Sequence, residues 1–295
     1  MRKKTIVIFF VCMLVIPSII VSAEKSEIKK ASTEESFDGP IWKVGNSWTF
    51  TVDNFWVNTT YQGNKVKMAG KIDDFKWIVS DVTETTYVVD VSGDVSAAYE
   101  VEAVLGNIVL EFNGAIEPST SRVKGTIIFD KTNLHIIDFD AQILCLSSVQ
   151  FFKLPIRIPL ALRIAADISL STPFPLLDFP LSTLKFWNLP EMDIVADIEM
   201  GGILGIIKVP MTVTKHYNWT PFAFCCLNQA TITVEGGTYD AWRILSLIGG
   251  YYDYYYAPIV GNLIKFEFDL PSGGASGELK GYEFSILDSN EKGVQ

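Results

Sequence analysis

The chain has 295 residues, of which 48% are hydrophobic and 13% aromatic, so it can bury a substantial core. Its 34 acidic residues outnumber its 24 basic residues and give a net charge of -10, which disfavours nucleic acid and anionic lipid surfaces as partners. Its two histidines do not stand at ligand spacing from any of its four cysteines, so we predict no metal site, and no motif indicates a cofactor.

The N-terminus has the pattern of a secretory signal. Three basic residues among the first four precede an apolar run over 5–21, which ends in the small residues Ser22 and Ala23. We predict a signal peptide over 1–23 and a protein that is secreted, extracellular or held at the cell surface. Cleavage removes three basic and no acidic residues and makes the net charge -13. The alternative is an uncleaved segment, about 17 residues long, that anchors the chain and is its one expected attachment to a membrane.

After Trp42 the sequence alternates apolar and polar residues at the period of a β-strand. In Ser47–Val52, Trp48, Phe50 and Val52 share one face. The same pattern predicts further strands over 77–79, 87–91, 101–110, 123–129, 134–145, 192–199, 204–215, 230–234, 239–247, 251–256, 263–268 and 278–286. No window holds helical spacing over three turns, so we expect at most a short helical turn near 173–182.

A weak internal repeat suggests how these strands are organised. Asn133–Asp140 is matched 129 positions later by Asn262–Asp269, with Asn, Leu, an acid, Phe and Asp recurring in register. We therefore predict two related β-units in tandem, separated within the proline-rich passage 155–180. The predicted boundaries are a disordered tether at 24–40, a first unit at 41–165, a second unit at 166–287 and a polar tail at 288–295.

Three stretches carry a resemblance to a family. They are 42–50, which holds Gly-Asn-Ser-Trp-Thr-Phe, 234–244, which reads Val-Glu-Gly-Gly-Thr-Tyr-Asp-Ala-Trp-Arg-Ile, and 255–265, which reads Tyr-Tyr-Ala-Pro-Ile-Val-Gly-Asn-Leu-Ile-Lys. Together they resemble uncharacterised secreted β-proteins, many of them archaeal. The resemblance implies open, strongly curved antiparallel sheets of the lipoprotein-carrier kind, so the two units are expected to be half-barrel-like. The chain departs from the family pattern at Glu235, where proline is usual.

Several residues in these stretches have an expected role in the fold. Gly236 and Gly237 permit a tight reversal before the strand at Thr238. Pro258 should end the tyrosine-rich strand, because it fixes φ and lacks an N–H group, and Gly261 is expected to be left-handed.

The densest aromatic stretch is the predicted strand 251–256. Tyr252, Tyr254 and Tyr256 share one of its faces. This face is either a platform for a sugar or a lipid headgroup, since tyrosine offers a flat ring and a hydroxyl group, or ordinary cross-strand packing. We take these three tyrosines as the tentative ligand-binding residues.

If the chain is secreted, its cysteines can form a disulfide and two of its asparagines can be glycosylated. One disulfide is expected outside the cell, from Cys145 to Cys225, with Cys226 as the alternative partner because adjacent cysteines point to opposite faces of a strand. Asn58 and Asn218 each begin a sequon and are the predicted glycosylation sites.

The sequence gives only a weak signal for catalytic groups. The carboxylates Asp138, Asp140, Glu267 and Asp269 recur in both copies of the repeat and alternate with phenylalanine, which is typical of a solvated sheet face. No nucleophile motif surrounds either histidine. We therefore predict no catalytic residue and a protein that is not an enzyme.

Two functional interpretations remain open. A curved sheet that does not close leaves a concave apolar face, which a lid, a sibling unit or a ligand must cover. The first interpretation is a binding or carrier protein for a lipid or another apolar or amphipathic ligand. The alternative is a structural or protein-interaction module of the cell envelope, whose core is filled by its own side chains and whose partner is an envelope protein.

Overall fold

The computed structural model describes residues 38–61, 64–105, 108–118, 121–151, 157–202, 207–246, 251–270 and 273–284. The predicted signal peptide, nearly all of the tether and the polar tail lie outside these residues. The described part consists of strands, turns and loops without a helix, and so contains no helix able to cross a membrane. The all-β prediction is confirmed, and the short helical turn expected near 173–182 is wrong, because β-strand and irregular bends occupy that stretch.

Fifteen strands make up the fold. They are β1 (Ser47–Tyr61), β2 (Asn64–Val82), β3 (Thr86–Leu105), β4 (Ile108–Ile116), β5 (Arg122–Asp130), β6 (Ile136–Phe151), β7 (Arg157–Phe174), β8 (Lys185–Leu189), β9 (Met192–Gly202), β10 (Ile207–Tyr217), β11 (Thr220–Val234), β12 (Gly237–Ser246), β13 (Tyr251–Ala257), β14 (Asn262–Leu270) and β15 (Gly273–Glu283).

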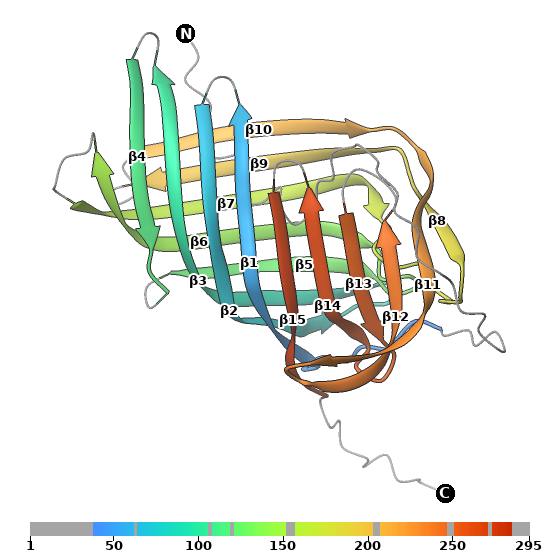
Figure 1. Ribbon diagram of the computed structural model, residues 1–295. Helices are drawn as coiled ribbons and strands as arrows, with labels where there is room; N and C mark the ends of the chain where they lie inside the picture. Colours follow the sequence, from blue (N-terminus) through green and yellow to red (C-terminus); the bar gives the residue numbers. More distant parts are fainter. Residues whose placement is uncertain are drawn as a thin grey trace, which may run out of the picture.

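All of these strands join one curved, unclosed antiparallel sheet. Its order is β10-β9-β7-β6-β4-β3-β2-β1-β15-β14-β13-β12-β11-β8. β4 and β5 succeed one another beside β3, because β3 pairs with β5 through its first half and with β4 through its second half. The sheet bends over itself, so that β1–β4 run in front of β6, β7, β9 and β10 and cross them at a steep angle (Figure 1).

The two predicted units are therefore parts of a single sheet. The expected boundary at 165/166 falls inside β7, and β1 pairs directly with β15 from the other end of the chain. The repeat segment Asn133–Asp140 leads into β6, the second strand of the β5–β6 hairpin. The matching segment Asn262–Asp269 lies in β14, the second strand of the β13–β14 hairpin. The duplication of one β-unit along the chain stays a prediction.

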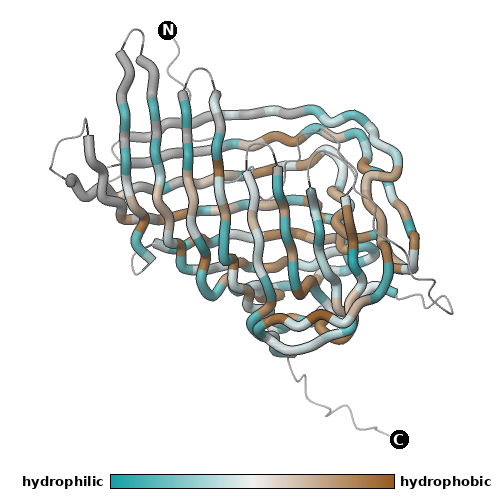
Figure 2. Tube along the Cα trace, in the orientation of Figure 1, coloured by the Kyte–Doolittle hydropathy of each residue, from teal (hydrophilic) through white to brown (hydrophobic). Residues whose placement is uncertain are grey.

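Apolar and polar residues alternate along many strands (Figure 2), and this alternation determines which side of a strand is buried. In β1, Trp48, Phe50 and Val52 are buried, as predicted. A register shift between Val52 and Asn54 then changes the phase, so that Phe55 and Val57 take over the inner face. The inner face of β1 is thus apolar from Trp48 to Val57.

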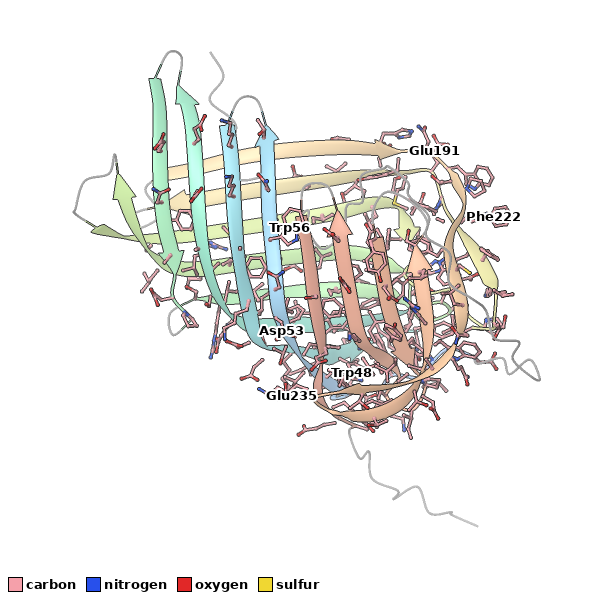
Figure 3. The ribbon with its side chains drawn as sticks, in the orientation of Figure 1. Trp48, Asp53, Trp56, Glu191, Phe222 and Glu235 are labelled. Atoms are coloured by element: carbon pink, nitrogen blue, oxygen red, sulfur yellow. The ribbon has the colours of Figure 1, made fainter. Side chains whose placement is uncertain are left out.

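An aromatic cluster closes the base of the molecule, where Figure 3 labels Trp48. The indole N–H of Trp42 donates to the carbonyl of Gly261 (2.8 Å), and that of Trp48 donates to the carbonyl of Val260 (2.8 Å). Gly261 has φ of 65°, and β13 ends at Ala257 before Pro258, so both predictions for this turn are confirmed. The turn positions two carbonyl groups for the two tryptophans, which joins the start of β1 to the β13–β14 hairpin.

Candidate functional site

The described part of the chain holds a small apolar cavity between the two crossing parts of the sheet. Its volume is about 90 Å3, and polar atoms contribute almost nothing to its surface. The residues that line it come from both parts and from the loop after β7: Phe50, Phe75, Trp77, Ile127, Ile136, Phe139, Leu176, Leu263, Phe266 and Phe268. The repeat segments contribute Phe139 and Phe268, so these two recurring phenylalanines serve one cavity.

The lining of the cavity is partly buried and partly open to the surface. Five of the lining residues are buried, namely Phe50, Phe75, Ile127, Phe139 and Leu263. The other five, Trp77, Ile136, Leu176, Phe266 and Phe268, are half-buried and so reach the surface. Phe266 and Phe268 stack on each other with their ring centroids 5.4 Å apart. This stacked pair on β14 forms the aromatic edge of the cavity.

The tyrosines predicted to bind a ligand stand beside this cavity and point into the core. Tyr254 and Tyr256 have no exposed surface, and burial raises the pKa of both hydroxyl groups. Tyr254 donates to the carbonyl of Leu176 (2.6 Å), which fixes one wall of the cavity. Tyr252 is half-buried and packs on Phe268 with ring centroids 5.3 Å apart. Tyr252 alone of the three is therefore placed where a ligand can reach it.

The loop between β7 and β8, residues 175–184, fills the concave side next to the cavity. Leu177 and Leu181 are buried in it. The indole N–H of Trp187 donates to the carbonyl of Pro175 (2.9 Å), and Lys185 forms an ion pair with Asp178 (3.1 Å). Part of the concave face is thus covered by the chain itself.

His135, in the turn between β5 and β6, faces this loop. Burial lowers its pKa, and this effect outweighs the opposing attraction of Asp130 and Asp178. Its Nδ1 atom lies 3.8 Å from the Asp130 carboxylate, and its Nε2 atom is buried without a protein partner. Burial against the filling loop therefore favours the neutral form of His135.

The disulfide expected between Cys145 and Cys225 is not formed, because Cys225 is a free buried thiol. Cys145 lies on β6, where it pairs with Leu162 of β7, whereas Cys225 lies on β11 near the opposite edge of the sheet. Cys226 is also free and buried, and burial raises its pKa to about 12. Four consecutive residues, 223–226, are buried, so both faces of β11 are covered there.

The remaining sequence candidates lie apart from one another. Asn58 is exposed on β1, and Asn218 is exposed on the connection between β10 and β11. Asp140 on β6 and Glu267 on β14 are both exposed, and these strands are far apart in the sheet order. Partial burial raises the pKa of Asp140. No group of His, Cys, Asp and Glu side chains suited to a metal ion occurs among the described residues.

One charged cluster, on the outer face of β12 and β13, was not predicted from the sequence. Arg243 donates two hydrogen bonds to Asp253, at 2.9 and 2.7 Å, and the Tyr251 hydroxyl donates to the same carboxylate at 2.9 Å. Asp253 is only 6% exposed. The alternation in 251–256 places Asp253 with Tyr251 and Tyr255. It does not show that Arg243, which pairs with Tyr255 on the neighbouring strand, reaches the carboxylate.

The chain was compared with protein-family models, curated proteins and solved structures, and none of the three comparisons gives a match. The family resemblance of the three sequence stretches therefore stays a prediction.

Proposed function

We propose that the protein is a non-enzymatic binding or carrier protein, secreted or held at the cell surface, that takes the end of an apolar or amphipathic molecule such as a lipid into the cavity between β1, β6 and β14. The observation that supports this is the lining of that cavity: ten apolar side chains with almost no polar surface. Cavities with so little polar surface stay dry and accept apolar guests.

The volume limits the ligand. A cavity of about 150 Å3 holds a benzene molecule. The cavity of about 90 Å3 therefore fits only the last few carbons of a chain, inserted end-on. The rest of such a molecule would lie along the half-buried rings of Phe266 and Phe268 and reach Tyr252.

Cavity filling tests this proposal. Ile136→Phe adds a ring to the cavity, and Ile232→Phe, at a half-buried position on β11 outside the lining, is the matched control. We expect dodecanoate to bind the natural chain in calorimetric titration, Ile136→Phe to weaken binding roughly tenfold or more, and the control to keep its affinity. Mass spectrometry of the purified protein should also detect a co-purifying lipid. Absence of dodecanoate binding, together with equal melting temperatures before and after delipidation, would overturn the proposal.

A second candidate function, an interaction module of the cell envelope, is favoured by an apolar edge at β8 and β11. Leu184, Phe186, Trp219 and Phe222 are large apolar side chains that are 43 to 63% exposed, and Figure 3 labels Phe222 at this edge. Leu184 and Phe222 adopt left-handed backbone angles (φ of 60° and 57°), which are costly for such residues. A photo-crosslinker at Phe222 should capture an envelope protein, and Phe186→Ser should abolish that product. A crosslinker at Glu235, which lies on a distant turn, is the control.

A further inference from the structure

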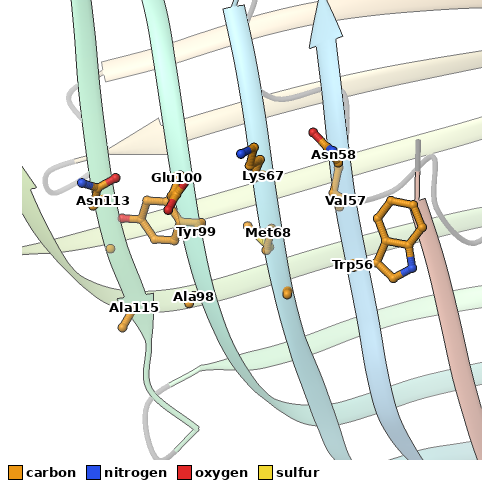
Figure 4. A pocket seen from close by; sticks show the side chains of 12 residues that line it. Trp56, Val57, Asn58, Lys67, Met68, Ala98, Tyr99, Glu100, Asn113 and Ala115 are labelled. Carbon is orange, nitrogen blue, oxygen red and sulfur yellow. The ribbon is translucent and has the colours of Figure 1, made fainter. Parts of the chain in front are cut away.

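A second, larger hollow crosses the strands β1–β4 away from the apolar cavity. Its volume is about 700 Å3, and Figure 4 shows the side chains that line it. Strand register aligns Asn58, Lys67, Glu100 and Asn113 in one row across the four strands. A parallel row, two residues away on each strand, holds Trp56 and three alanines, Ala69, Ala98 and Ala115.

These two rows face the solvent. Val57 lies between them on β1 and is buried, with its side chain on the opposite, inner face. Asn58, Lys67, Glu100 and Asn113 are all exposed, as are Ala69 and Ala98. Because the exposed lining belongs to the outward rows, the hollow opens on the outer face of the sheet. It is therefore separate from the cavity of the proposed function.

Trp56, an aromatic residue that lines the hollow, packs its indole against Gly274 of the neighbouring strand. Trp56 pairs with Gly274 of β15, and a β-carbon at Gly274 would lie 2.6 Å from the indole Nε1 atom. Glycine at this position lets the half-buried indole lie over β15, at the end of the hollow that Trp56 lines. A flat aromatic face is the surface against which the C–H groups of a sugar ring stack.

We propose that this hollow binds a neutral oligosaccharide. The row of side chains supplies two amides, one carboxylate and one ammonium group, which are donors and acceptors suited to hydroxyl groups and carry no net charge. The alanine side chains in the parallel row are short, so a flat sugar ring can approach the surface of the sheet there. Strands about 4.8 Å apart make the row from β1 to β4 about 14 Å long, which suits several linked sugar rings rather than one.

Calorimetric titration of the whole chain tests this proposal, with protein from a bacterial host that adds no N-linked glycan at Asn58. The probes are cellohexaose, chitohexaose and mannohexaose, with polygalacturonate as an acidic glycan. We expect at least one neutral hexasaccharide to bind, Trp56→Ala to weaken it roughly tenfold or more, and Trp56→Phe to retain most of the affinity. Trp219→Ala, which removes an exposed tryptophan elsewhere, should change nothing.

Other outcomes overturn the assignment. Binding of polygalacturonate alone would point to an anionic ligand, and the failure of all three neutral probes would remove the oligosaccharide. The variants Glu100→Ala and Asn113→Ala test the polar row at exposed positions, where loss of the fold is not expected. Unchanged affinity for the hexasaccharide in both variants would contradict the role of this row. Dodecanoate binding is measured in the same experiments. A loss of oligosaccharide binding can therefore be distinguished from a loss of binding in the apolar cavity.

Discussion

Breaking the ion pair between Arg243 and Asp253 should cost more stability than any exposed ion pair on the sheet. Arg243→Met removes both hydrogen bonds, at 2.9 and 2.7 Å, and leaves a carboxylate that is 6% exposed. Loss of one partner of a buried pair costs about 3 to 5 kcal/mol. The Tyr251 hydroxyl still donates to Asp253, and the arginine side chain is one-third exposed, so we expect the low end, about 3 kcal/mol.

Urea unfolding followed by circular dichroism measures this free energy. The matched control is Arg122→Met, which breaks the exposed pair with Asp94 and should cost less than about 1 kcal/mol. The double variant Arg243→Met with Asp253→Leu should lose less than the single variant, because no charge is then left buried without its partner. Equal losses for Arg243→Met and Arg122→Met would refute the reasoning.

Three further predictions concern protonation, thiol reactivity and close packing. The folded pKa of His135 lies below its unfolded value of 6.5, so the folded state binds fewer protons than the unfolded state. The contribution of His135 to the free energy of unfolding should therefore be complete above pH 6.5 and fall as the pH drops below 6.5. His135→Gln should flatten this part of the curve of unfolding free energy against pH. Cys225 and Cys226 should resist iodoacetamide in the folded protein and react in urea, as read by mass spectrometry; rapid labelling of both without urea would contradict their burial. Gly125→Ala should cost about 1 to 3 kcal/mol in urea unfolding, because the new β-carbon meets the Asp140 carbonyl oxygen of the neighbouring strand, whereas Gly281→Ala meets nothing within 4 Å and should cost less.

Local features of this fold could be predicted from the sequence because they depend on neighbouring residues. Alternation around Trp48 identified β1 and its buried face, and Pro258 and Gly261 identified the turn before β14. The proline-rich passage was predicted as a boundary, yet most of it is β7. Pro159 lies within β7, opposite Ser148 of β6, and the described pairing of β7 with β9 begins at Leu162.

Features that depend on distant parts of the chain could not be predicted. The pairing of β1 with β15 makes one sheet out of two expected units, and no local pattern encodes it. The period-two rule placed Cys225 and Cys226 on opposite faces, one of them toward Cys145. The rule does not show that both thiols are buried at the place where β11 pairs with β8. The cavity also escaped sequence reasoning, because its lining comes from strands separated along the chain.

A crystal of the protein under xenon pressure tests the proposed apolar cavity most directly. Xenon enters dry apolar cavities. We predict a single xenon peak enclosed by Phe50, Phe139 and Phe266, with the sheet otherwise unchanged. Ordered water at this position, or side chains that close the space, would contradict the account.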